Sequence, residues 1–135
     1  MGRAGDTISA QVHETVGQAA ARLAEKRIGA MPVLDGAALV GIFSERDVIY
    51  TLANKGEGAL GTALADAMTA DPVTVDPDTR VMSALSLMTR RRIRHLPVMS
   101  EGALVGFVSI GDLVKARIDA IEAEAEAMRA YIQTA

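Results

Sequence analysis

The chain contains no cysteine and no tryptophan, and it has only two histidines, two phenylalanines and two tyrosines. The absence of cysteine excludes disulfides, thiolate metal sites and cysteine nucleophiles. Two histidines, His13 and His95, are too few for a histidine cluster that binds a metal. With so few aromatic side chains, a platform on which nucleic-acid bases stack is not expected.

The sequence also lacks long apolar runs and a strong excess of either charge. It has no run of about 18 apolar residues that could span a membrane, and the N-terminal MGRAGD lacks the apolar stretch of a signal peptide. The formal net charge is −3 and the pI about 5.3, so the molecule has no general attraction for nucleic acid or an anionic membrane. These features predict a soluble cytoplasmic protein with no membrane or nucleic-acid partner.

Common catalytic motifs are missing as well. The sequence has no P-loop, no Gly-x-Ser-x-Gly nucleophile elbow and no histidine-carboxylate metal spacing. The segment GEGALG (56–61) matches the Gly-x-Gly-x-x-Gly dinucleotide fingerprint, but it follows an expected helix over 46–54 instead of a strand. We therefore interpret Gly56 as a helix end and the glycines as a flexible linker. Neither an enzyme nor a bound metal is expected.

One segment of the sequence occurs twice. LVGIFSERD (39–47) returns as LVGFVSIGD (104–112), a shift of 65 residues that aligns most of both halves of the chain without a gap. Two copies are too few for a solenoid, which needs about three repeats or more. The duplication predicts a pair of repeats related by a pseudo-twofold axis.

Each copy is expected to fold as strand, helix, strand, strand and helix. The short apolar segments Ile8–Ala10 and Val73–Val75 begin the two copies as strands. Thr15 and Gln18 have the spacing of a capping box at the start of the first helix. Thr79 is expected to cap the equivalent helix of the second copy.

Two strands joined by a tight turn follow in each copy. Their sequences are MPVL and ALVGIF in the first copy, and LPVM and ALVGFV in the second. Pro32 and Pro97 have no backbone N–H for a sheet, so they are expected at strand starts or edges. Ser44 and Ser109 stand where the last strand gives way to a helix, a position that favours an N-cap.

The repeated Ser-x-x-Asp motif lies at these helix starts. A helix N-terminus attracts phosphate and other anions, and an aspartate in the first turn, Asp47 or Asp112, can accept two hydrogen bonds from the diol of a ribose. The plainer interpretation is that serine and aspartate only cap the helix and complement its dipole. Because the motif is repeated in the same strand context, we favour a nucleoside clamp.

The segment over 7–118 resembles the tandem cystathionine-β-synthase-type (CBS) domain pair. The resemblance rests on RIGAMPVLDGAALVGIFSERDV and RIRHLPVMSEGALVGFVSIGDL, in which apolar-Pro-Val, a turn, apolar-Val-Gly and Ser-x-x-Asp all occur twice. Within the family, the chain is similar to small bacterial stand-alone proteins. The resemblance implies an α/β fold in which two repeats pack sheet to sheet with pseudo-twofold symmetry and leave two clefts. It divides the chain into repeat 1 (7–55), a linker (56–67), repeat 2 (68–118) and a C-terminal helix (119–135).

The same resemblance implies a function. Clefts of this family commonly bind adenosyl ligands such as AMP, ADP, ATP, NAD or S-adenosylmethionine, so the expected role is a regulatory sensor without an obligatory cofactor. The aspartate would hold the ribose, and the serine would lie near ribose or phosphate. By resemblance, the first cleft would use Ile8, Ala10, Met31, Pro32, Ser44 and Asp47, and the second Val73, Val75, Leu96, Pro97, Ser109 and Asp112. The alternative is a protein-interaction scaffold whose clefts are vestigial.

The two clefts are expected to differ in charge. Arg94 and His95 stand where adenylate-binding family members place basic residues that contact phosphate, and the first copy has glycine and alanine there. The first copy has Arg46 within SERD instead. We therefore predict that the Asp112 cleft is the stronger phosphate-dependent site and that the Asp47 cleft prefers less phosphate or relies on Arg46.

The C-terminal segment has helix-forming residues and no glycine or proline after Gly111. Its apolar residues are spaced four, three, four, three and four, as in the seam of a coiled coil: Val114, Ile118, Ile121, Ala125, Met128 and Ile132. This stripe either docks on the surface of its own module or forms a dimer contact. The family resemblance favours a homodimer, and the regulated partner protein is unknown.

Overall fold

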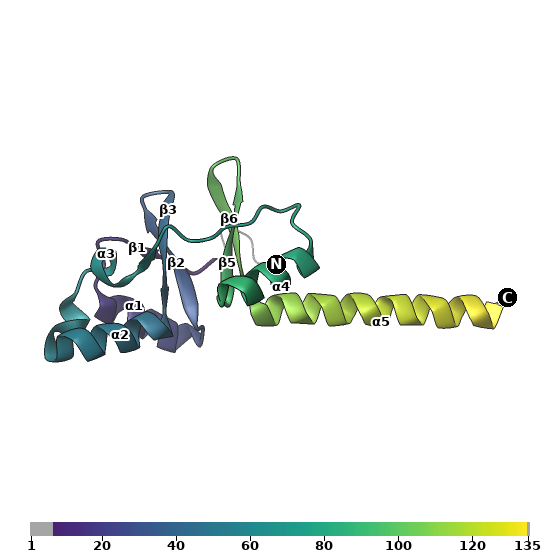
Figure 1. Ribbon diagram of the computed structural model, residues 1–135, viewed down its shortest axis with the longest axis horizontal. Coiled ribbons are helices and arrows are strands. Elements are labelled where there is room, and N and C mark those ends of the chain that lie inside the picture. Colours follow the sequence, from purple (N-terminus) through teal and green to yellow (C-terminus); the bar gives the residue numbers. More distant parts are fainter. Residues whose placement is uncertain (1–6, 135) are drawn as a thin grey trace.

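The computed structural model describes residues 7–134 as an α/β module from which one long helix projects (Figure 1). The first repeat consists of β1 (Ala10–Gln11), α1 (Val16–Lys26), β2 (Ala30–Asp35), β3 (Ala38–Ser44) and α2 (Glu45–Lys55). The connecting segment holds η2 (Gly56–Gly61), α3 (Leu64–Ala67) and β4 (Thr69–Ala70). The second repeat holds α4 (Val81–Arg91), β5 (His95–Ser100), β6 (Ala103–Ser109) and α5 (Ile110–Thr134). This order confirms the predicted α/β fold of two strand-helix repeats and a C-terminal helix.

The two repeats share their strand pairing and their helix ends. Antiparallel pairing joins β2 to β3 and β5 to β6, and each ladder has one irregularity, after Val33 in the first and after Val98 in the second. Helices α1 and α4 both end at an arginine in the left-handed conformation, Arg27 with φ 54° and Arg92 with φ 55°. Strand β3 of the first repeat contacts β6 of the second, so the two sheets pack against each other.

The first strand of each repeat is shorter than predicted. In the second repeat only Val75 pairs, through one parallel bridge to Val98. Pro32 and Pro97 are the third residues of β2 and β5, and β2 lies between β1 and β3. The prediction that these prolines lie at strand starts or edges is therefore wrong for Pro32, whereas Pro97 lies in β5, an edge strand of the two-stranded sheet that it forms with β6. Proline is tolerated in β2 because the parallel pairing with β1 begins one residue later, at Val33.

The first helix of each repeat begins differently. The predicted capping box of α1 is confirmed, because the Gln18 N–H donates to Thr15 Oγ1 at 3.2 Å and the Thr15 N–H donates to Gln18 Oε1 at 2.9 Å. Helix α4 begins after Arg80, which makes no side-chain cap. The Thr79 hydroxyl instead donates to Asp76 Oδ1 at 3.3 Å. The prediction that Thr79 caps α4 is wrong, because its hydroxyl is held in the preceding turn.

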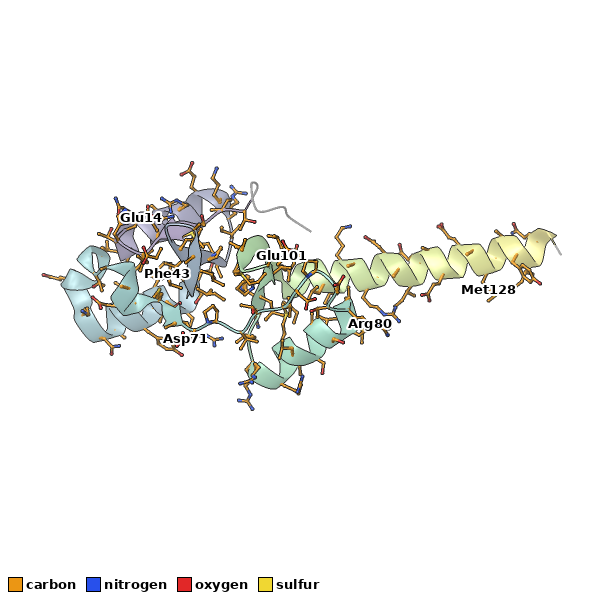
Figure 2. The ribbon with its side chains drawn as sticks, turned by 90° about the horizontal axis from the view of Figure 1, so that it is seen from above. Glu14, Phe43, Asp71, Arg80, Glu101 and Met128 are labelled. Carbon is orange, nitrogen blue, oxygen red and sulfur yellow. The ribbon has the colours of Figure 1, made fainter. Side chains whose placement is uncertain are left out.

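Each repeat has its own apolar core, and Phe43 lies inside the first (Figure 2). The buried residues of the first core are Ala10, Val16, Ala19, Leu23, Met31, Val33, Phe43 and Leu64, and those of the second are Ala84, Met88, Leu96, Val98, Val108 and Leu113. The removal of these apolar side chains from water is the main contribution to the stability of each repeat.

The segment that connects the repeats is folded and not the flexible linker that its glycines suggested. Leu64 is fully buried, and the Val16 N–H donates to the Thr62 carbonyl at 2.8 Å. A buried apolar side chain and a backbone hydrogen bond therefore fix this segment against the first repeat. Strand β4 then approaches β3 so closely that a Cβ atom at Gly41 would lie 2.8 Å from a β4 carbonyl oxygen, which explains the glycine there.

Helix α5 extends far beyond the module (Figure 1). Its first turns pack on α4 and β6 through the buried Leu113. The later turns have no module surface beside them, and Met128 lies near the far end (Figure 2). Among the residues that the structure describes, the apolar stripe does not dock on its own module, so that predicted alternative is wrong.

Candidate functional site

Both Ser-x-x-Asp motifs cap a helix with reciprocal hydrogen bonds. At the start of α2, the Ser44 N–H donates to the Asp47 carboxylate at 2.9 Å and the Asp47 N–H donates to Ser44 Oγ at 3.4 Å. At the start of α5, the Ser109 N–H donates to the Asp112 carboxylate at 2.8 Å and the Asp112 N–H donates to Ser109 Oγ at 3.1 Å. Helix capping is therefore a confirmed role of both motifs.

The two aspartates differ in whether a carboxylate oxygen is left without a hydrogen bond from residues 7–134. Asp47 is only 8% exposed, and both of its oxygens are used, Oδ2 by Ser44 and Oδ1 by the Thr69 hydroxyl at 3.2 Å. Asp112 is exposed, and its Oδ1 accepts no hydrogen bond from residues 7–134. Of the two motifs, only the second presents an open carboxylate oxygen to a ligand.

Asp112 lies on the wall of a cleft of about 390 Å³ between the two repeats. We call it the carboxylate cleft, and its lining residues are Thr7, Ile8, Arg27, Ile28, Gly29, Ala30, His95, Phe107, Ser109 and Asp112. Ile8 and Ile28 supply apolar surface from repeat 1, while Asp112 supplies an anion from repeat 2 and Arg27 a cation. An apolar lining with a few convergent polar groups is typical of a small-molecule site.

His95 forms another wall of the carboxylate cleft. Its ring stacks on Phe107 with centroids 5.5 Å apart and planes inclined by 13°. Burial lowers the pKa of the His95 imidazole below its ordinary 6.5, and the neighbouring Arg94 lowers it further, while Asp112 and Glu45 raise it. The net shift is downward, so the imidazole is neutral at pH 7 and meets a ligand as a hydrogen-bonding group, not as a cation.

A second cleft of about 280 Å³ carries the positive charge. This arginine cleft is lined by Arg46, Met88, Thr89, Arg92, Ile93, Arg94 and Ile110. Arg92 and Ile93 are the repeat-2 counterparts of Arg27 and Ile28, so the two clefts occupy equivalent places in the two repeats. The lining includes three guanidinium groups and no acidic side chain. The cleft is therefore suitable for an anionic group.

The structure groups the predicted site residues differently from the sequence analysis. Ile8 lies in the cleft of Asp112 and not with the aspartate of its own repeat. Arg94 lies in the cleft of Arg46, whereas His95 lies in that of Asp112. Arg94 is the last residue before β5 and His95 is its first residue, and their side chains line different clefts.

The other predicted site residues line neither cleft. Ser44 and Asp47 cap α2, and the rest lie in the cores or beside them: Ala10, Met31, Pro32, Val73, Val75, Leu96 and Pro97. Arg27 lines the carboxylate cleft although it is not among the residues predicted from the sequence. A signal for it was present, since the Arg-Ile pair at 27–28 aligns with the pair at 92–93 under the 65-residue shift.

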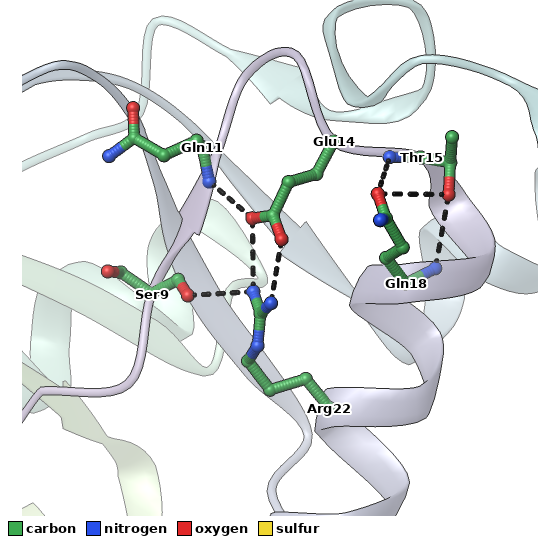
Figure 3. Close-up of polar contacts among 6 residues, drawn as sticks. All are labelled: Ser9, Gln11, Glu14, Thr15, Gln18 and Arg22. Atoms are coloured by element: carbon green, nitrogen blue, oxygen red, sulfur yellow. Dashed lines mark hydrogen bonds and ion pairs between the residues drawn. The ribbon is translucent and has the colours of Figure 1, made fainter.

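An ion pair holds the backbone next to Ile8 in place (Figure 3). The Arg22 guanidinium donates to both carboxylate oxygens of Glu14, at 2.7 and 3.1 Å, and to the Ser9 carbonyl at 3.0 Å. The Gln11 N–H donates to Glu14 at 2.7 Å. Hydrogen bonding to Arg22 lowers the pKa of Glu14, so the pair is charged at neutral pH. These hydrogen bonds fix the backbone beside Ile8, which forms one wall of the carboxylate cleft.

Two further features of residues 7–134 bear on function. No group of three or more histidine, aspartate or glutamate side chains is placed to hold a metal ion. No helix in this part of the chain is long and apolar enough to cross a membrane.

The profile of the family described as CBS domain matches the chain twice, over residues 5–54 and 64–119. The chain belongs to the CBS-domain family. The mitochondrial CBS domain-containing protein CBSX3 of Arabidopsis thaliana is 37% identical over 125 residues, which cover 89% of this chain and 61% of that relative. The CBS domain-containing protein YhcV of Bacillus subtilis is 30% identical over 80% of each chain. At 61% coverage, the chain spans less than two thirds of the length of CBSX3.

Solved CBS structures have the same fold as this chain. A CBS-domain containing protein of Agrobacterium tumefaciens is 37% identical, with a TM-score of 0.80 over 86% of this chain and 91% of that one. CBSX2, which was solved in complex with AMP, is 27% identical, with a TM-score of 0.77 over 88% of this chain and 93% of that one. The likeness extends over the whole CBS pair.

Proposed function

We propose that this CBS pair is a regulatory module that binds an adenosyl ligand in the carboxylate cleft and has no catalytic activity. The ligand class is AMP, ADP, ATP or NAD. One observation carries the proposal: the open carboxylate of Asp112 faces a cleft that both repeats line. We place the module in the cytoplasm, as the sequence predicts.

The lining of the carboxylate cleft suits the parts of an adenosyl ligand. A carboxylate oxygen accepts two hydrogen bonds from a vicinal diol, so Asp112 holds the ribose. Ile8 and Ile28 provide aliphatic surface for adenine, and Arg27 is the cation of this cleft available to a phosphate. The structure of CBSX2 with AMP supports the adenosyl class, since that relative shares the fold over most of both chains.

The arginine cleft has a different role in the proposal. Asp47 is enclosed by Ser44 and Thr69, so it does not hold a ribose as Asp112 does. Arg46 and Arg94 provide charge for an anionic ligand there. From the sequence, Arg94 was expected to make the Asp112 cleft the more phosphate-dependent one. Because Arg94 lines the arginine cleft instead, we assign the phosphate dependence to that cleft, and Arg27 is the cation beside Asp112.

Regulation follows from the position of the carboxylate cleft. Its walls come from both repeats, so a ligand in it makes contacts that depend on how the repeats pack. A ligand that binds one packing better than another shifts the population toward it by the difference in binding free energy. A partner protein that reads this packing would respond to the nucleotide.

The proposal is tested by isothermal titration of the full chain with AMP, ATP, NAD and S-adenosylmethionine. We expect micromolar binding of at least one ligand, a loss of about tenfold or more in affinity in Asp112→Ala, and wild-type affinity in the exposed control Glu57→Ala. The nucleotide is recovered afterwards and checked for chemical change. Absence of binding by every ligand would instead favour the scaffold with vestigial clefts, and turnover would favour an enzyme.

A further inference from the structure

Helix α5 presents an apolar stripe that nothing in residues 7–134 covers. Ile118 is 49% exposed, Ile121 47%, Met128 60% and Ile132 65%. Met128 lies near the far end of α5, which extends away from the module (Figures 1 and 2). A row of large apolar side chains left in water along one helix marks an interaction surface.

The stripe has the spacing of a coiled coil. With Ile118 at an a position, Ile121 falls at d, Ala125 at a, Met128 at d and Ile132 at a. With Val114 at the preceding d position, large apolar residues occupy every core position over 114–132, just under three heptads, except at the central alanine. A helix of this pattern buries its stripe against a second helix of the same pattern, so a second copy of the chain is a suitable occupant.

The charges beside the stripe select the orientation of that second copy. In a parallel pair, each g residue faces the e residue five positions further along the other helix. Arg117 then faces Glu122 of the second copy, and Glu124 faces Arg129 of the second copy. By symmetry each contact occurs twice, and every one of them joins opposite charges.

An antiparallel pair of the same helices meets like charges. In the alignment that matches a positions with d positions, residues at e face e and residues at g face g. Glu122 would then face Glu122, Glu124 would face Glu124, and Lys115 would face Arg129. Like charges across a coiled coil disfavour the pair.

We propose that α5 forms a parallel two-stranded coiled coil with a second copy of the chain over residues 114–132. Parallel pairing places both CBS modules at the same end of the coil, so a dimer has its four clefts on neighbouring modules. The proposal rests on α5 alone, and a failure of nucleotide binding would leave it unchanged. The central alanine and the short length predict a dimer that dissociates on dilution, because short coiled helices are marginal in water.

Orientation is tested by a disulfide, since the chain has no cysteine of its own. In a parallel coil, residues at one a position face their counterparts, close enough for a disulfide, so Ala125→Cys is expected to give a covalent dimer under mild oxidation. Ala127→Cys, on the opposite face of the same helix, is the matched control and is expected to stay mostly monomeric on a non-reducing gel. Equal cross-linking of the two variants would overturn the parallel coil.

Association is tested by sedimentation of the full chain at several concentrations. We expect a dimer for the wild type and at least a tenfold higher dissociation constant for Ile121→Asp, whose circular dichroism should keep the helical signal of the module. Reversal of the e charges alone, in Glu122→Arg with Arg129→Glu, is expected to weaken the dimer as well. A monomeric wild type, or a dimer that neither variant weakens, would contradict the proposal.

Discussion

Replacement of Asp47 and Asp112 by alanine should separate stability from ligand binding, although the two residues occupy equivalent places in the repeats. Asp47 is buried and accepts hydrogen bonds from Ser44 and Thr69. Asp112 is exposed and accepts only from Ser109 among residues 7–134. We expect Asp47→Ala to damage folding and Asp112→Ala to damage binding.

The expected sizes follow from these contacts. Either substitution removes the acceptor of the serine N–H and the negative charge in the first helical turn, which costs about 1 kcal/mol, and this is the whole structural loss in Asp112→Ala. Asp47→Ala adds the partly buried Thr69 hydroxyl left without its acceptor, at about 1–3 kcal/mol for such a group. The free energy of unfolding should therefore fall by about 3 kcal/mol in Asp47→Ala, some 2 kcal/mol more than in Asp112→Ala.

Urea denaturation at one fixed protein concentration measures the difference. With an m-value of about 2 kcal/mol per M, the midpoint of Asp47→Ala should lie about 1 M below that of Asp112→Ala. Titration with AMP should give the reverse order, because a hydrogen bond to a charged acceptor is worth about 1.5–3 kcal/mol, or roughly ten- to a hundredfold in affinity. Equal midpoints, or equal losses of affinity in well-folded variants, would refute the distinction between the two motifs.

Three further predictions concern stability. Gly41→Ala should lower the free energy of unfolding by about 1–3 kcal/mol because its Cβ would meet backbone 2.8 Å away, whereas Gly58→Ala, with nothing within 4 Å, should change the urea midpoint little. Arg22 lowers the pKa of Glu14 below 4.5, so the stability gained from that pair is complete above pH 4.5 and is lost as the pH falls through the lowered pKa. Urea titrations at several pH values should therefore show less loss of stability in acid for Glu14→Gln than for the wild type. Equal losses would contradict this. Because the pKa of His95 is lowered in the folded state, the imidazole is protonated at a higher pH in the unfolded chain than in the folded one. The wild type should therefore lose more stability than His95→Gln between pH 7 and pH 5. Parallel plots of unfolding free energy against pH would show that the imidazole is not buried as described.

The repeats and their caps could be predicted because they depend on local sequence. The 65-residue shift gave the equivalence of the two halves, and the spacing of Thr15 and Gln18 gave a capping box that the structure contains. Strand pairing, turn positions and the serine N-caps at the starts of α2 and α5 follow the same short-range rules. Such features require only neighbours along the chain.

The composition of the clefts could not be predicted in this way, because it depends on contacts between distant residues. Thr69 reaches Asp47 from 22 positions away and closes its carboxylate. Ile8 meets Asp112 only because the two sheets pack together. The family resemblance placed Arg94 and His95 together, whereas the structure places them in different clefts.

A crystal structure of the full chain grown with AMP tests the central claim most directly. We predict the ribose hydroxyls on the Asp112 carboxylate, with the base beside Ile8 and the phosphate toward Arg27. AMP bound only in the arginine cleft, or a ribose held by other residues while Asp112 faces solvent, would contradict the assignment of the carboxylate cleft as the nucleotide site.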